Sequence, residues 1–298
     1  MPRNVKIGPE MKSEISPFRV AIVQMRSTQD PWENLLTMKD FIDQAIGANC
    51  QLICFPENCC YRGPKRSDVF DRKELFLKIK KGKIEENSEF SSSFVEMLKH
   101  CPIAVSFGSV FECSDELERP FNTHLFYRPG MDLVSYRKIH LFNFVGSDAS
   151  YRESDDFKAG QSVVCADFLD WKFGLSICYD LRFPETYRKM VLEQGAQVLL
   201  APAAFTMQTG KAHWSLLNRA RAVENLSYVV SSTQWGEHSN AKGLTFECFG
   251  HALAIDPWGQ VLDELSEVGD SFITVELFKD KLIQIRRNLP SLNSVPTI

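Results

Sequence analysis

Short apolar runs alternate with amphipathic stretches along the chain. Residues 18–24 and 51–55 are apolar runs of strand length, and each predicts a buried strand. Between them, apolar residues recur at helical spacing over residues 35–46, which predicts a helix that begins at Asp30 and Pro31. A strand, a helix and a second strand in this order are typical of an α/β fold.

The same alternation continues toward the C-terminus. It predicts further strands at residues 103–111, 122–127, 133–138, 163–168, 172–177, 197–201, 228–232, 249–255, 261–265 and 272–276. It predicts further helices at residues 90–100, 184–194, 211–224 and 279–287. So many strands would crowd one flat sheet, and we therefore expect two sheets packed face to face with helices outside.

Two stretches lack a regular pattern. Residues 62–87 are strongly charged and are expected to form a solvated loop or an exposed helix, and residues 141–160 are expected to be a loop. No repeat, low-complexity linker or change in composition divides the 298 residues. We therefore expect one domain at residues 17–298, preceded by a flexible polar leader at residues 1–16.

Charge and hydropathy exclude several classes of partner. The net charge is −4 and there is no long basic run, which disfavours nucleic acid and anionic membranes as partners. The first residues lack the apolar core of a signal peptide, and no apolar run approaches the ~18 residues of a membrane span.

The chain has nine cysteines, an odd number. Without an export signal, this predicts reduced thiols in the cytoplasm. Cys50, Cys54, Cys59 and Cys60 lie close together, but they contain no paired C-x-x-C motif and no nearby histidine. We therefore expect neither a metal site nor a cofactor.

The strand predicted at residues 172–177 delivers Cys178 to its end. A tight polar turn follows at residues 178–180, and a helix begins near Pro184. Such a turn holds a side chain at the edge of a sheet and directs the next backbone N–H groups toward a developing negative charge. From this stretch alone, Cys178 is equally well interpreted as a nucleophile or as a small buried apolar residue.

A thiol nucleophile needs a group that takes its proton. Among the six histidines His140 is the most suggestive, but none lies in a cysteine-protease signature. A better helper is Glu57, which follows the strand at residues 51–55, at the end of a strand where sites in α/β folds usually lie. Lys138 ends another predicted strand, so three strand ends offer a carboxylate, an ammonium and a thiol.

Three motifs, in this order, resemble the nitrilase (carbon–nitrogen hydrolase) superfamily: Phe55-Pro-Glu57, Tyr136-Arg-Lys138-Ile-His-Leu-Phe142 and Cys178-Tyr-Asp-Leu-Arg-Phe-Pro-Glu185. The resemblance covers residues 18–289. Further stretches are similar to the Nit amidases, with the deaminated glutathione amidases as the nearest branch and the omega-amidases next: residues 203–214, 218–224, 250–251 and 256–259.

The resemblance implies a four-layer α-β-β-α sandwich and a Glu–Lys–Cys triad. Glu57 would be the general base, Cys178 would attack an amide carbonyl and form a thioester, and Lys138 with the N–H of Tyr179 would hold the oxyanion. Lys138 beside Cys178 would also favour the thiolate. Glu153 matches a second acidic position of the family that orients the lysine or the substrate, and it is otherwise interpreted as an exposed loop carboxylate.

The substrate pocket is predicted less sharply. Phe205, Thr206 and Thr209 follow a strand end and are expected to line it. Arg182 would either neutralise a substrate carboxylate or brace the turn through Asp180 or Glu224, and these alternatives stay open. The chain departs from its nearest relatives at residues 143–150 and 65–83, next to the expected mouth of the site.

The expected substrate is a small amide that bears a carboxylate. The first hypothesis is deaminated glutathione, cleaved to 2-oxoglutarate and cysteinylglycine. The alternative is an omega-amidase acting on 2-oxoglutaramate or 2-oxosuccinamate, or another small aliphatic amidase. From a different class, the chain would be an inactive scaffold or a thiol-rich redox protein. The family further implies a homodimer or higher homo-oligomer that pairs across helices including the one at residues 184–194.

Overall fold

The computed structural model describes residues 16–63, 72–116, 119–145, 150–239, 245–266 and 268–294. Residues 1–15 of the predicted leader lie outside the described residues. The same holds for residues 64–71 and 146–149, which fall in the two stretches that depart from the relatives.

The first sheet has eight strands in the order β15-β14-β1-β2-β5-β6-β7, and β18 also pairs with β1. These strands are β1 (Phe18–Met25), β2 (Leu52–Phe55), β5 (Ala104–Glu112), β6 (Phe121–Tyr127), β7 (Val134–Arg137), β14 (Thr233–Ser239), β15 (Thr245–Phe249) and β18 (Ser271–Leu277). The sheet is mixed, because β1 runs parallel to β2 and β14 but antiparallel to β18.

The second sheet has six strands in the order β10-β11-β12-β13-β16-β17. They are β10 (Val164–Phe168), β11 (Trp171–Leu175), β12 (Val198–Leu200), β13 (Tyr228–Ser231), β16 (Leu253–Ile255) and β17 (Val261–Glu264). The strands predicted at residues 163–168 and 172–177 form a hairpin, in which β10 pairs antiparallel with β11 from the pair of Val164 with Leu175 to that of Phe168 with Trp171. The following strands β11, β12 and β13 are parallel.

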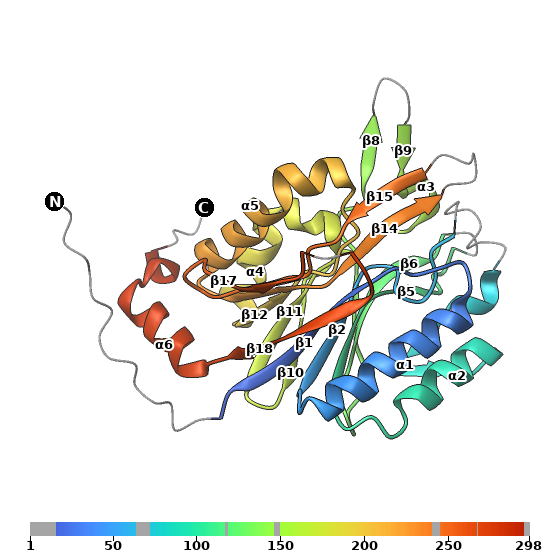
Figure 1. Ribbon diagram of the computed structural model, residues 1–298, viewed down its shortest axis with the longest axis horizontal. Helices are drawn as coiled ribbons and strands as arrows, with labels where there is room; N and C mark the ends of the chain where they lie inside the picture. The colour runs from blue at the N-terminus through green and yellow to red at the C-terminus, as the bar shows by residue number, and fades with distance from the viewer. Residues whose placement is uncertain are drawn as a thin grey trace.

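Helices cover the outer faces of both sheets. Figure 1 shows α1 (Pro31–Gly47) and α2 (Glu89–Leu98) side by side along one sheet, and α4 (Pro184–Gln194) and α5 (Met207–Asn225) on the opposite side of the molecule. The start of α1 is as predicted, because the side chain of Asp30 accepts hydrogen bonds from the N–H groups of Trp32 and Glu33. The helix α6 (Lys279–Asn288) follows β18 and lies beyond the end of the sandwich (Figure 1).

Three apolar cores separate the four layers. On β1, Ala21 and Val23 face a core that includes Met38 and Phe41 of α1. Alternate residues such as Ile22 face the core between the two sheets. A third core joins the second sheet to α4 and α5, and it contains Met190, Leu199, Trp214 and Val229. The four-layer α-β-β-α sandwich is therefore confirmed.

Both stretches that were expected to be irregular contain regular structure. In the first, β3 (Lys78–Lys80) and β4 (Lys83–Glu85) form a hairpin whose turn residues Lys81 and Gly82 have φ values of 49° and 70°. In the second, β8 (Asn143–Val145) pairs with β9 (Ser150–Arg152), and the one-turn helix α3 (Glu153–Asp156) follows. The first stretch was expected to be a solvated loop or an exposed helix, and the second a loop, and both predictions are wrong at these hairpins. Backbone pairing between the strands defines them, and a pattern of apolar residues does not show such pairing.

Several strands near the C-terminus and the start of one helix also differ from prediction. The strand expected at residues 249–255 is interrupted, because Gly250 and His251 have positive φ values of 72° and 63° that break the chain between β15 and β16. The strand β14 and most of β15 were not predicted. The helix α5 begins at Met207, one turn before the predicted residue 211, so that it includes Thr209.

Candidate active site

Cys178 opens a short 3₁₀ helix, Cys178–Arg182, that follows β11. Its φ is 47°, a left-handed conformation that is uncommon for a residue with a side chain. Its backbone N–H donates to the carbonyl of Pro202 at 2.8 Å, which ties the turn to the end of the neighbouring strand β12. The predicted sharp turn after the strand is therefore present, and it fixes the thiol at the end of the sheet.

Glu57, Lys138 and Glu153 come together in one buried cluster. Lys138 Nζ donates to Glu57 Oε1 at 2.8 Å and to Glu153 Oε1 and Oε2 at 3.1 and 3.0 Å. The three residues are at most 2% exposed, so the interpretation of Glu153 as an exposed loop carboxylate is wrong. Glu57 follows β2, Lys138 follows β7 and Glu153 begins α3, so distant parts of the chain supply the cluster.

Asn122, on β6, is a member of the cluster that the sequence reasoning missed. Its Nδ2 donates to Glu57 Oε1 at 3.1 Å and to Glu153 Oε1 at 3.3 Å. The N–H of Phe142 adds a 2.7 Å hydrogen bond to Glu153 Oε2. These neutral donors matter because two buried carboxylates face a single ammonium. A polar residue inside a strand predicted to be buried was the available signal.

The surroundings of Cys178 keep its thiol protonated. Burial raises the pKa of Cys178 well above that of an ordinary thiol, the negative charge of Glu57 raises it further, and the charge of Lys138 lowers it by less. The contribution of Lys138 has the expected direction, but it does not make the thiolate the resting form. A reaction of this thiol as a nucleophile would therefore need a base, and Glu57 is close enough for its charge to act on the sulfur.

The turn after Cys178 is held by the buried carboxylate of Asp180. It accepts hydrogen bonds from Ile177 N at 2.9 Å, from the hydroxyl of Tyr136 at 2.7 Å and from His140 N at 3.0 Å. His140 Nδ1 lies 2.8 Å from Asp180 Oδ1, and its ring stacks on Phe183 with 3.7 Å between centroids. His140, the most suggestive histidine in the sequence, thus belongs to the support of the turn.

Arg182 lies beside aromatic rings and a histidine. Its guanidinium lies 5.8 Å from the ring centroid of Tyr179 and 5.4 Å from that of Phe205, and its Nη2 is 3.3 Å from His213 Nδ1. Within the described residues it forms no ion pair with Asp180 or Glu224, so the bracing interpretation is wrong. Glu224 instead pairs with Arg221 of the same helix at 2.7 Å.

Of the residues expected to line the pocket, Phe205 lies beside Arg182. Phe205 is 7% exposed and packs against Trp214, so it supports Arg182 more than it forms an open wall. Thr206 precedes α5, and its hydroxyl is 3.1 Å from that of Thr209. Within the described part of the chain, the N–H of Tyr179 has no hydrogen-bond acceptor, which leaves it available to an oxyanion.

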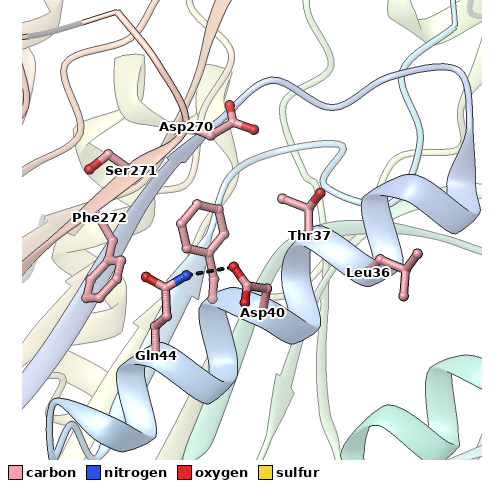
Figure 2. A pocket seen from close by; sticks show the side chains of 8 residues that line it. Leu36, Thr37, Asp40, Gln44, Asp270, Ser271 and Phe272 are labelled. Atoms are coloured by element: carbon pink, nitrogen blue, oxygen red, sulfur yellow. Dashed lines mark hydrogen bonds between the residues drawn. The ribbon is translucent and has the colours of Figure 1, made fainter.

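A surface depression of about 500 Å³ lies elsewhere, between α1 and the start of β18 (Figure 2). One of its carboxylates, Asp40, accepts a 2.7 Å hydrogen bond from Gln44. The other, Asp270, accepts one from Arg26 N. None of the predicted site residues lines it, so it offers no alternative centre for the chemistry.

The described residues contain no group of three or more histidine, cysteine, aspartate or glutamate side chains that could hold a metal ion. No helix among them has both the length and the apolarity needed to cross a bilayer.

Comparisons with known proteins agree with this geometry. The chain is 34% identical over 284 residues to the deaminated glutathione amidase of Dictyostelium discoideum, covering 92% of each chain. It is 31% identical over 278 residues to omega-amidase NIT2 of Danio rerio, covering 93% of this chain and 94% of that one. The solved structure of Saccharomyces cerevisiae Nit3, a member of branch 10 of the nitrilase superfamily, matches with a TM-score of 0.77 at 28% identity, covering 92% of this chain and 94% of that one.

The family model described as Carbon-nitrogen hydrolase matches residues 19–287, which is nearly the whole sandwich. The chain therefore belongs to the carbon-nitrogen hydrolase family.

Proposed function

We propose that the protein is an amidase that cleaves a C–N bond through a thioester on Cys178. The observation that carries the proposal is the buried contact of Lys138 with both Glu57 and Glu153, next to a thiol presented in a left-handed turn. A base, a cation and a nucleophile in contact distance of one another are the minimal set for acyl transfer.

The proton moves between sulfur, carboxylate and nitrogen. As the thiol of Cys178 attacks the amide carbon, Glu57 takes its proton, and the carbonyl oxygen becomes an oxyanion held by Lys138 and the N–H of Tyr179. Glu57 then gives this proton to the departing amine, and the C–N bond breaks to leave the thioester. A water molecule that loses a proton to Glu57 attacks the thioester carbon. The C–S bond then breaks to release the carboxylic acid product, and Glu57 returns the proton to the sulfur of Cys178.

Glu153 and Asn122 act on these reaction steps by positioning Glu57 and Lys138. Glu153 accepts from the ammonium of Lys138, which also donates to Glu57, and Asn122 donates to both carboxylates. Together they keep the Glu57 carboxylate and the Lys138 ammonium fixed while the charge on sulfur and oxygen changes.

The proposed substrate is deaminated glutathione, and the second candidate is 2-oxoglutaramate. The names of the two relatives support these candidates, and the partly buried guanidinium of Arg182 suits a carboxylate at the acyl end of either compound. Turnover of the two compounds by the purified protein, expressed as kcat/KM, decides between them. A clear preference for 2-oxoglutaramate would favour the omega-amidase.

The direct test of the nucleophile replaces Cys178 by alanine. This variant should lose amide turnover and the transient mass of an acyl-enzyme, while Cys165→Ala, which removes a partly buried thiol of β10 that contacts the carbonyl of Met190 outside the cluster, should keep both. If the two variants retain equal activity, the assignment of Cys178 fails. A wild-type protein that turns over no amide would favour an inactive scaffold or a thiol-rich redox protein.

We also propose a homodimer in a reducing, cytoplasmic setting. Three apolar side chains are exposed on the outer helices, Leu192 of α4 at 43% and Leu216 and Val223 of α5 at 68% and 46%, and pairing across these helices would cover them. All nine cysteines are free thiols, as expected where disulfides do not form. Light scattering at micromolar concentration should give the mass of at least two chains.

A further inference from the structure

Arg62 is a cation with unused hydrogen-bond donors near the catalytic cluster. Its Nε and Nη1 are buried and have no hydrogen-bond partner in the described part of the chain. Its Nη2 makes only a 3.5 Å contact with the sulfur of Cys248, and its guanidinium lies 5.2 Å from the ring centroid of Phe246. Leaving such donors unpaired costs free energy, so the site is suited to an anion that would accept from them.

The backbone around Arg62 is fixed. Arg62 N donates to the carbonyl of Thr28 at 3.0 Å, and the side chain of Asn34 donates to the carbonyl of Cys60 at 3.1 Å. The side chain of Gln234 donates to the carbonyl of Glu57 at 2.9 Å, at the other end of the same segment. The guanidinium is therefore carried by a segment that needs little ordering to bind a ligand.

Arg62 lines a depression of about 140 Å³, together with Arg26, Ser27, Thr28, Gln29, Glu237 and His238. His238 contributes no positive charge near neutral pH, because burial and the charge of Arg62 lower its pKa to about 3. Glu237 is exposed, and no ion pair joins it to Arg62 within the described residues. Two arginines and one glutamate thus line a space large enough for a carboxylate, so the charge around it is positive on balance.

The depression adjoins the catalytic site through β15. Cys248, the contact of Arg62, forms an antiparallel bridge with Thr206, and the N–H of Phe249 donates to the carbonyl of Phe205 at 2.9 Å. The charges of both Arg62 and Glu57 reach the thiol of Cys248. Arg62 and Glu57 therefore both lie near Cys248, which borders the segment at residues 205–206, whereas Arg182 contacts the ring of Phe205.

This position points to the leaving amine. In the proposed reaction Glu57 protonates the departing nitrogen, so the amine half of the substrate extends from the Glu57 side of the cluster. We propose that Arg62 binds a carboxylate on the amine half of the substrate and so selects amides whose amine product is anionic. The inference rests on the proposed function and narrows its substrate class: cysteinylglycine carries such a carboxylate, whereas the ammonia released from 2-oxoglutaramate does not.

The test compares two substrates that differ only at this group: deaminated glutathione and its analogue in which the terminal glycine carboxylate is a carboxamide. Arg62→Gln should lower kcat/KM for the carboxylate substrate by about 10- to 100-fold, mostly through KM, and leave the carboxamide within about twofold. Arg62→Lys should restore part of the preference, because it keeps the charge but loses the planar fork. Equal effects of Arg62→Gln on both substrates, or no effect on either, would overturn the proposal.

A binding measurement separates this inference from the reaction itself. Calorimetry with Cys178→Ala should show tighter binding of the carboxylate compound than of the carboxamide, and Cys178→Ala/Arg62→Gln should bind the two equally. This difference is read without turnover, so it holds even if the amidase assignment fails. If Cys178→Ala binds both compounds equally while the wild type cleaves them, the amidase stands and the role of Arg62 is wrong. Arg26→Gln serves as the neighbouring control, with a smaller loss expected because its guanidinium lies over Trp235.

Discussion

The ammonium of Lys138 lies 3.0 Å from Glu153 Oε2, and the two side chains are at most 1% exposed. This contact gives the ammonium of the cluster a second carboxylate beside Glu57. The two carboxylates hold the ammonium together, so its position is set before any substrate arrives.

Replacing Glu153 by glutamine tests this contact. The variant keeps the shape of the side chain but removes its charge, and we expect kcat to fall by about 100-fold because a lysine displaced by even a small amount no longer meets the oxyanion. The free energy of unfolding should fall by about 1–3 kcal/mol, measured by urea denaturation. Glu96→Gln breaks the exposed pair with Lys99 and should change neither quantity appreciably. Normal activity in the Glu153 variant would contradict the positioning role.

The charge of Glu57 governs the acidity of the nucleophile. Glu57 raises the pKa of the Cys178 thiol, and Lys138 lowers it. In Glu57→Gln the pKa of Cys178 should therefore fall, and alkylation of Cys178 by iodoacetamide should begin at a lower pH than in the wild type, although amide turnover is lost. Peptide mass spectrometry reads the alkylation of each cysteine, with Cys165 as the internal reference. An unchanged pH profile for Cys178 would show that the two groups do not interact.

Gly108 on β5 allows the two sheets to meet below the site. A Cβ atom there would lie 2.2 Å from the carbonyl oxygen of Phe55, two residues before Glu57. It would also lie 2.2 Å from the Cβ of Pro202, whose carbonyl accepts from the N–H of Cys178. Gly108→Ala should lower the free energy of unfolding by about 1–3 kcal/mol and reduce kcat, because the strand ends must move apart. Gly47→Ala, where nothing lies within 4 Å, is the matched control and should be neutral or slightly stabilising. Equal stability of the two variants would rule out the close packing.

His124 should make stability depend on pH. Its ring is buried between Ser106 Oγ at 2.7 Å and the carbonyl of Ser176 at 2.9 Å, and burial lowers its pKa to about 4. Because the unfolded chain binds a proton near pH 6.5 and the folded chain does not, the free energy of unfolding should fall by about 3 kcal/mol as the pH drops from 6.5 to 4. Urea denaturation at several pH values measures this slope. In His124→Gln the dependence of the unfolding free energy on pH should be smaller by the contribution of one proton. A wild type without any such slope would contradict the assignment.

Local pattern was sufficient for much of the sandwich. The strand β1 and the helix α1 follow from an apolar run, a helical repeat and the N-cap Asp30. The position of Cys178 at a strand end also follows from sequence. The strand ends already grouped Glu57 and Lys138 with Cys178. The family resemblance added Glu153 and the roles, because residues so distant along the chain meet only through tertiary packing.

The remaining elements depend on partners that a sequence pattern does not show. The strand β14 is largely polar and pairs with β1 at only two positions, Gln24 with Thr233 and Met25 with Gln234. The hairpin of β3 and β4 is held by the ion pairs of Lys78 and Lys80 with Glu85. The sequence pattern did not predict a role for Asn122, because that role depends on two carboxylates supplied by other parts of the chain.

The left-handed backbone of Cys178 has a further consequence for engineering. Glycine adopts this conformation without steric cost, whereas a side-chain-bearing residue pays about 1–2 kcal/mol. Cysteine at this position thus provides a thiol, with a lower free energy of unfolding than glycine would give. Cys178→Gly should lack activity but have a higher free energy of unfolding than Cys178→Ala. It would therefore be the better variant for crystallising the protein with an uncleaved amide bound.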